Sequence, residues 1–133
     1  MLYRTAMLVD DDLVFTTMLS RFLQQKKLRV HSLKDGRAAK SYLLDGRPDI
    51  VICDVVLPYH SGFELVKFIR KELELLVPII MISSIDSENA LNKSLVAGAN
   101  VFLPKPLDLG VLSDQLAHFL KLEPSGNILT NKM

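Results

Sequence analysis

The sequence predicts an α/β fold in which a doubly wound, five-stranded parallel sheet is covered by helices on both faces. Short apolar runs alternate with longer amphipathic segments five times along the chain, the pattern of strands joined by helical crossovers. Two of these runs, residues 50–53 and 78–82, are apolar throughout, as strands buried on both faces are. The length of 133 residues suits one compact domain.

The first two strand–helix units lie in the N-terminal part of the chain. Residues 6–9 predict a strand, and residues 28–30 predict a weaker second one. Apolar residues recur at helical spacing after the first strand: Val14, Phe15, Met18, Leu19, Phe22 and Leu23. A second helix with Ala38, Ala39, Tyr42 and Leu43 on one face is stopped by the Gly-Arg-Pro run at 46–48.

Three more units follow in the same order. Residues 50–53 predict the third strand, 78–82 the fourth and 101–103 the fifth. The third helix is indicated by Phe63, Leu65, Val66, Ile69 and Leu73. The fourth contains Ala90, Leu91, Ser94 and Leu95 and ends at Gly98, and the fifth contains Leu112, Leu116, Phe119 and Leu120. The pattern ends near residue 123, so we expect residues 123–133 to form a flexible tail or the start of a linker.

Composition and charge exclude several classes of function. The formal net charge is +1 and no basic patch is visible, so neither nucleic acid nor an anionic membrane is expected as a direct partner. No apolar stretch approaches the roughly 20 residues of a membrane-spanning helix, and the N-terminus does not resemble a signal peptide. With Cys53 as the single cysteine, a cytoplasmic protein is the expectation.

Polar residues follow four of the five predicted strands. Because parallel strands end at one edge of the sheet, residues distant in sequence should meet there. They are Asp10, Asp11, Asp12, Asp54, Ser83, Ser84 and Lys105. Clustered carboxylates repel by roughly 4 kcal/mol per pair at about 4 Å and an effective dielectric of 20, so the cluster needs a cation.

The chemistry of this cluster points to phosphoryl transfer. Carboxylate oxygens with room for water suit Mg²⁺, and Lys105 supplies a second positive charge. A metal, an ammonium group and the hydroxyl of Ser83 around Asp54 would neutralise a transferring phosphoryl group. The carboxylate itself can be the nucleophile, giving an aspartyl-phosphate.

Each of these residues also has a purely structural interpretation. Asp12 stands just ahead of a helix, where capping is the better explanation. Lys105 alone would be a solvated lysine, and Ser83 alone a loop hydroxyl. Asp54 is harder to explain in this way, because a carboxylate that closes an apolar strand needs a partner. We expect Cys53 to be a core residue and His60 to be a surface histidine.

At this point the motifs resemble those of the receiver domains of two-component response regulators, over residues 1–122. The run 7–12 resembles the family's apolar strand with its acidic pair, and 54–58 with Gly62 resembles the phosphoacceptor loop. Residues 78–84 resemble the strand with the switch Ser/Thr, and 98–106 the family's Lys-Pro ending. The resemblance implies a flavodoxin-like fold with strand order 2-1-3-4-5.

The resemblance also implies roles for individual residues. Asp54 would be the phosphoacceptor and would bind Mg²⁺ with Asp11 and the backbone carbonyl of Val56, while Asp10 would act largely through water. Lys105 would pair with Asp54 and then with the phosphoryl group. Two residues would form the switch: Ser83, which would bond the phosphoryl group, and Phe102, which would turn inward.

Partners are implied in the same way. The phosphodonor would be a sensor histidine kinase or a histidine phosphotransfer protein, and the last two helices would contact a downstream protein. Such a domain is a regulatory switch, not an enzyme in the ordinary sense, although it assists its own phosphorylation and dephosphorylation. The chain would be a stand-alone receiver or a fragment that has lost an effector domain.

Departures from the family pattern leave other interpretations open. Ser84 stands where a small Ala or Gly is usual and would narrow access to the phosphoryl group, while Leu57 is a neutral exchange for Met. Asn100 and Val101 replace a common Asp-Asp pair, so we expect a monomer or weak dimer. One alternative is a pseudo-receiver that works without phosphorylation. A second is a haloacid dehalogenase-type hydrolase with Asp10 as nucleophile and Asp12 as partner, which leaves Asp54 without a role.

Overall fold

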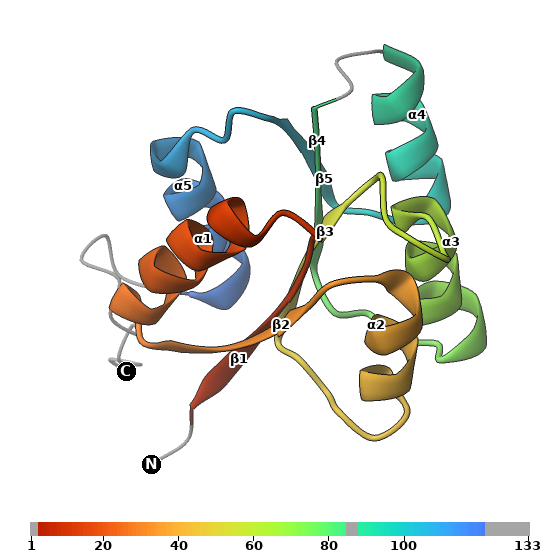
Figure 1. Cartoon of the computed structure of the whole chain (residues 1–133), viewed down its shortest axis with the longest axis horizontal. Coiled ribbons are helices and arrows are strands. Elements are labelled where there is room, and N and C mark those ends of the chain that lie inside the picture. Colours follow the sequence, from red (N-terminus) through yellow and green to blue (C-terminus); the bar gives the residue numbers. More distant parts are fainter. Residues whose placement is uncertain (1–2, 85–87, 122–133) are drawn as a thin grey trace, which may run out of the picture.

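A five-stranded parallel sheet forms the centre of the computed structural model, which describes residues 3–84 and 88–121 (Figure 1). The expected tail at 123–133 lies outside the described residues. The strands are β1 (Arg4–Val9), β2 (Leu28–Leu33), β3 (Ile50–Asp54), β4 (Ile79–Ser83) and β5 (Val101–Pro104). Their order in the sheet is β2-β1-β3-β4-β5, with every neighbouring pair parallel. The predicted fold and strand order are confirmed.

Helices cover both faces of this sheet. They are α1 (Leu13–Gln25), α2 (Gly36–Leu43), α3 (Gly62–Lys67), α4 (Glu88–Ala97) and α5 (Leu109–Leu120), and α3 continues into the π-helix η1 (Phe68–Glu72). Figure 1 shows α1 and α5 on one side of the sheet and α2, α3 and α4 on the other. The alternation of side chains along a strand divides the core accordingly: Ile50 and Ile52 pack with the first pair of helices, and Val51 and Cys53 with the second group.

Polar residues fix where several helices begin. Asp12, Asp35, Ser61 and Asp108 each precede a helix, and their side chains accept hydrogen bonds from backbone N–H groups of the first turn. The plain interpretation of Asp12 as a cap is therefore correct. By fixing the first residue of α1, this cap also fixes the loop that carries Asp10 and Asp11.

The elements differ from the sequence prediction mainly at their ends. β2 runs to Leu33 instead of residue 30, because it is an edge strand in which the exposed His31 and Ser32 interrupt the apolar run. The fourth strand begins at Ile79, one residue after Pro78, whose ring nitrogen has no proton to donate.

The third helix also differs, because its second half is a π-helix in which the Leu73 N–H donates to the Phe68 carbonyl. The Arg70 guanidinium in this turn donates to the Gly98 carbonyl, the Leu75 carbonyl and Asn100 Oδ1. These three hydrogen bonds attach the π-helical turn to Leu75 and to the segment between α4 and β5. Among residues 3–84 and 88–121, no helix is long and apolar enough to cross a bilayer.

Candidate functional site

Two buried carboxylates meet where neighbouring strands end. Asp10 directly follows β1, and Asp54 is the last residue of β3. The two strands are paired, with Val9 beside Cys53 in the register. Only 2% of Asp10 and 8% of Asp54 is exposed to solvent. Carboxylates buried to this extent need a compensating positive charge.

Lys105 supplies that charge from the loop after β5. Its Nζ donates to Asp10 Oδ2 at 2.8 Å and to Asp54 Oδ2 at 3.2 Å. Its backbone N–H donates to the Ser83 carbonyl at 2.8 Å, which fixes the loop against the end of β4. The sequence predicts a pair between Lys105 and Asp54; the structure places the ammonium group between two carboxylates and nearer to Asp10.

The electrostatics of the site reflect this arrangement. Burial raises the pKa of Asp54, and the nearby charge of Asp10 raises it further, while Lys105 and the Val56 N–H work in the opposite direction. Burial alone would lower the pKa of Lys105, but hydrogen bonds and charge from Asp10 and Asp54 outweigh it and raise the pKa. The lysine therefore stays charged, and the acidic site remains short of positive charge.

Asp11 completes a group of three carboxylates that suits a metal ion. One oxygen each of Asp10, Asp11 and Asp54 lies within 4.8 Å of the other two. Asp11 is exposed, so its side of the group is open to water. An all-oxygen donor set with access to water fits Mg²⁺, which keeps several water ligands. Val56 stands beside this group, and its N–H donates to Asp54 Oδ1 at 3.2 Å.

The two predicted switch residues lie on neighbouring strands. Ser83 is fully buried at the end of β4 and pairs with Pro104 in the register. Phe102 on β5 is half-buried and packs against the core between the sheet and α2, α3 and α4. Ser84 is exposed next to Ser83. The structure thus brings Ser83, Lys105 and the acidic group to one edge of the sheet, while Phe102 lies further back along its strand.

One residue of the site was missed by the sequence analysis. Phe15 was assigned only to the apolar stripe of the first helix, but its ring centroid lies 4.3 Å from Lys105 Nζ. Its position in the first turn of α1, three residues after the cap Asp12, places it next to the strand ends. The closeness of Phe15 in sequence to the acidic run could have indicated this role. Helical periodicity alone, however, assigns every apolar residue to the core.

Several residues have the ordinary roles expected of them. Cys53 is fully buried, and burial raises the pKa of its thiol, so the thiol stays protonated. His60 is partly exposed, and its Nδ1 lies 3.3 Å from Glu64 Oε2 one helical turn away.

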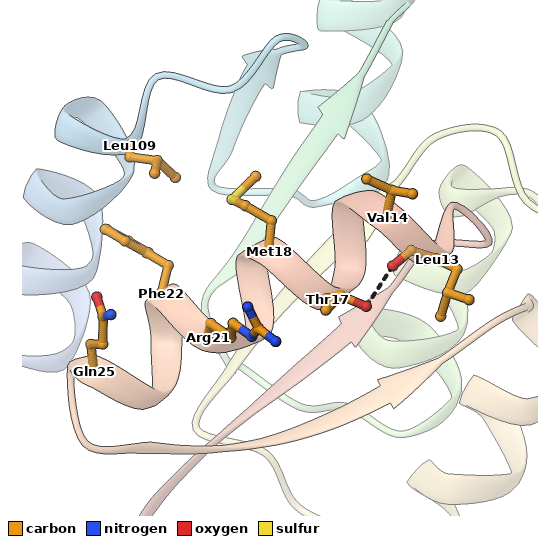
Figure 2. Close-up of a pocket in the computed structure, with 8 residues that line it drawn as sticks. All are labelled: Leu13, Val14, Thr17, Met18, Arg21, Phe22, Gln25 and Leu109. Carbon is orange, nitrogen blue, oxygen red and sulfur yellow. Dashed lines mark hydrogen bonds between the residues drawn. The ribbon is translucent and has the colours of Figure 1, made fainter.

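An apolar groove of about 600 Å³ runs along α1 beside the site (Figure 2). Leu13 and Val14 are 72% and 80% exposed at its near end, and Met18 is 41% exposed further along. Leu109 from the start of α5 closes the opposite wall. Because Leu13 is the next residue after the acidic run 10–12, this end of the groove lies near the edge that carries Asp10 and Asp54.

Comparison with known proteins gives one consistent result. Residues 6–117 match the family model of the response regulator receiver domain. The two-component response regulator ORR3 of Oryza sativa subsp. indica is 36% identical over 101 residues, which cover 74% of this chain and 77% of that protein. The two-component response regulator ARR17 of Arabidopsis thaliana is 30% identical over 125 residues, with 84% and 82% covered.

Solved structures agree with the sequence comparison. The chemotaxis response regulator CheY4 of Vibrio cholerae superimposes with a TM-score of 0.81 and 30% sequence identity, covering 90% of this chain and all of that one. The receiver domain of the Francisella response regulator 1452 has a TM-score of 0.82 at 22% identity, covering 89% of this chain and 97% of that one, a likeness of fold.

Proposed function

Because this chain belongs to the family of response regulator receiver domains, we propose that it is a switch controlled by phosphorylation of Asp54. Members of this family are regulatory proteins of two-component signalling that partner with histidine kinases or phosphotransfer proteins. The observation that carries the proposal is the shared ammonium group of Lys105, within hydrogen-bonding distance of both buried carboxylates. A salt bridge made only for stability needs one carboxylate, whereas this site keeps a surplus of negative charge beside a nucleophile.

The reaction uses the Asp54 carboxylate as nucleophile. A carboxylate oxygen attacks phosphorus, the bond from phosphorus to the donor's histidine nitrogen breaks, and the imidazole leaves with the electron pair. Receiver domains bind Mg²⁺ at an acidic pocket, and the residues to hold it here are Asp10, Asp11, Asp54 and the Val56 carbonyl. Bound Mg²⁺ supplies positive charge that neutralises the phosphoryl oxygens.

Lys105 and Ser83 complete the transfer. Lys105 moves from its two carboxylates toward the phosphoryl oxygens, and the Ser83 hydroxyl donates a hydrogen bond to one of them. Since Ser83 lies at the end of β4 and its carbonyl holds the Lys105 backbone, a shift of Ser83 would be transmitted to the loop after β5. Phe102 turns inward in response, and the surface of α4, β5 and α5 changes shape for a downstream protein.

The phosphodonor docks on the groove of α1. A donor whose phosphohistidine reaches Asp54 must cover the surroundings of the site, and the exposed side chains of Leu13 and Val14 lie there. Burying them would stabilise the complex. In this proposal residues 1–122 form the receiver, residues 123–133 form a tail or linker, and the protein is a cytoplasmic monomer or weak dimer.

The test is intact mass after incubation with Mg²⁺ and acetyl phosphate, for the wild type, Asp54→Asn, Asp10→Asn and a matched control. The control is Asp49→Asn, because Asp49 is an exposed carboxylate just ahead of β3, at the opposite end of the strand from Asp54. The wild type and the control should gain one phosphoryl group, dependent on Mg²⁺, and Asp54→Asn should gain none. A gain that survives in Asp54→Asn and disappears in Asp10→Asn would assign the nucleophile to Asp10 and overturn the proposal.

A phosphorylated phosphotransfer protein serves as a second donor, because some receivers refuse small ones. If the wild type gains no mass from either donor, the domain works as a pseudo-receiver. Unchanged partner binding by Asp54→Asn would support that alternative.

A further inference from the structure

The ammonium group of Lys105 has a third neighbour besides its two carboxylates. The ring centroid of Phe15 lies 4.3 Å from Nζ, within the roughly 6 Å at which a cation is attracted to an aromatic face. Only 17% of the Lys105 side chain is exposed, so water weakens this attraction less than it would at the surface. We propose that Phe15 is a positioning residue that keeps the Lys105 ammonium group at the phosphoacceptor, an inference that rests on the function proposed above.

The position of Phe15 is itself fixed by the acidic run. The Asp12 N–H donates to Asp10 Oδ1 at 2.9 Å, and Asp12 Oδ1 accepts from the Phe15 N–H at 3.1 Å. Lys105 Nζ, which lies over the Phe15 ring, donates to the other oxygen of Asp10. A ring of contacts thus joins four residues: Asp10 after β1, the cap Asp12, Phe15 in the first turn of α1, and Lys105 in the loop after β5. The first turn of α1 therefore cannot move without moving the phenyl group over Lys105.

This placement matters because the carboxylates alone cannot hold Lys105 throughout the reaction. A lysine has a flexible four-carbon stem, and phosphorylation moves the negative charge from the Asp54 carboxylate to the phosphoryl oxygens. The attraction of Lys105 to the neutral phenyl ring does not change in that step. Phe15 thus keeps the ammonium group at the edge of the sheet while it moves from Asp10 and Asp54 to the phosphoryl oxygens.

A competing explanation is that Phe15 only fills space, because it also packs against the core between the sheet and α1 and α5. The two explanations separate when the charge distribution of the ring changes and its size does not. Pentafluorophenylalanine at position 15 inverts that distribution, and Phe15→Leu removes the ring but keeps an apolar side chain. Phe15→Tyr keeps both the ring and its attraction for cations.

A matched control exists on the other face of the sheet. Phe68 lies under the Lys40 ammonium group, with 5.0 Å between Nζ and the ring centroid. It packs against the core between the sheet and α2, α3 and α4. Phe68→Leu therefore removes the same kind of contact far from the proposed reaction. A loss of activity shared by both leucine variants would reflect general destabilisation.

Two measurements are made on this set of variants. The first is the maximum rate of phosphoryl uptake at saturating acetyl phosphate and Mg²⁺. We expect it to fall about fivefold in Phe15→Leu and in the pentafluoro variant, and to stay within about twofold of the wild type in Phe15→Tyr and Phe68→Leu. The second is the NMR shift of the Lys105 ε-methylene protons in protein without Mg²⁺, which the ring above them should move upfield in the wild type and Phe15→Tyr but not in Phe15→Leu.

A rate in the pentafluoro variant within 1.5-fold of the wild-type rate, on the order of experimental error, would overturn the positioning role. So would a wild-type Lys105 shift identical to that of Phe15→Leu. If the wild type takes up no phosphoryl group from any donor, the proposed function fails, and the ring-current shift still decides whether Phe15 holds Lys105.

Discussion

Carboxylates lie at both ends of the parallel strands, but they are treated differently at each end. At the amino ends, Asp49 precedes β3 and is exposed. Its Oδ2 accepts from the Thr5 N–H at 2.7 Å, and its own N–H donates to the Thr5 carbonyl at 2.8 Å. At the carboxyl ends, Asp10 and Asp54 are buried and share one ammonium group. The Asp49 carboxylate holds the start of β3 to β1 by a hydrogen bond. The two carboxylates of Asp10 and Asp54, in contrast, repel each other and lose hydration when they are buried.

The difference shows how burial separates a structural carboxylate from the one that we propose to react. Asp49 can be hydrated and has a backbone partner, so its charge costs little. Asp54 has lost most of its water, and burial together with Asp10 raises its pKa. A site that holds buried negative charge together in this way is stabilised when a cation binds to it. The following predictions probe that contrast.

The largest effect on stability is expected from Gly62→Ala. A Cβ at Gly62 would lie 2.2 Å from the Asp54 carbonyl oxygen and 2.9 Å from Val55 Cα, both backbone atoms at the carboxyl end of β3. Since backbone cannot yield as a flexible side chain does, we expect the free energy of unfolding to fall by about 3 kcal/mol. Urea unfolding followed by circular dichroism measures it. Gly110→Ala is the control, because its Cβ would meet only Asp108 Oδ1 at 3.2 Å; equal losses in both variants would contradict the prediction.

Lys105→Met is expected to destabilise the protein by about 2 kcal/mol in the absence of Mg²⁺, because it leaves two buried carboxylates without a counter-charge. Mg²⁺ should recover much of this loss, since a ligand of the native state raises its stability by mass action. Urea unfolding with a chelator and with excess Mg²⁺ separates the two contributions. A loss that is the same under both conditions would mean that packing of the lysine stem, not its charge, is responsible.

Asp54→Asn should have the opposite sign and raise the free energy of unfolding by about 1 kcal/mol at pH 7 without Mg²⁺, because it removes one of two repelling carboxylates. The pKa of Asp54 is raised on folding, so the wild type gains stability from protonation at low pH and loses it as pH rises through the folded-state pKa. The advantage of the variant should therefore be present at neutral pH and disappear below the unfolded-state pKa. Thermal unfolding from pH 3.5 to 7, a range chosen around the unperturbed Asp pKa of about 3.9, tests this. An advantage that grows as pH falls would show that the charge of Asp54 is stabilising.

Much of the fold follows from the sequence because the two apolar strands at the sheet centre have one physical explanation. Residues 50–53 are apolar on both sides, so helices must cover both faces, and the crossovers then place the strand ends together. The sequence predicts the ends of the edge strand and of the third helix less accurately. His31 and Ser32 in β2 are exposed and carry no apolar signal. The π-helix at Phe68–Glu72 contains Arg70, which donates hydrogen bonds to residues far along the chain that a local pattern cannot include.

The site divides in a similar way. The meeting of Asp10, Asp54 and Lys105 follows from topology, because each stands at the end of a strand. The nearer approach of Lys105 to Asp10 does not follow, since it depends on side-chain torsions in the loop after β5. Phe15 was not predicted for another reason: an aromatic residue at helical spacing is assigned to the core, and only the folded structure shows that its ring faces a cation.

The smallest effect is expected at the amino ends, from Asp49→Asn. The asparagine oxygen can still accept from the Thr5 N–H, and the charge that is lost was hydrated, so the free energy of unfolding should fall by at most about 0.5 kcal/mol. Titration of Mg²⁺ against the stability of this variant should give the wild-type midpoint, whereas Asp54→Asn should shift the midpoint to higher Mg²⁺. If Asp49→Asn shifted it equally, the Mg²⁺ effect would come from the charge of the whole protein. The contrast between the two ends of the sheet would then be wrong, because the loss of a buried carboxylate and the loss of an exposed one would change Mg²⁺ binding equally.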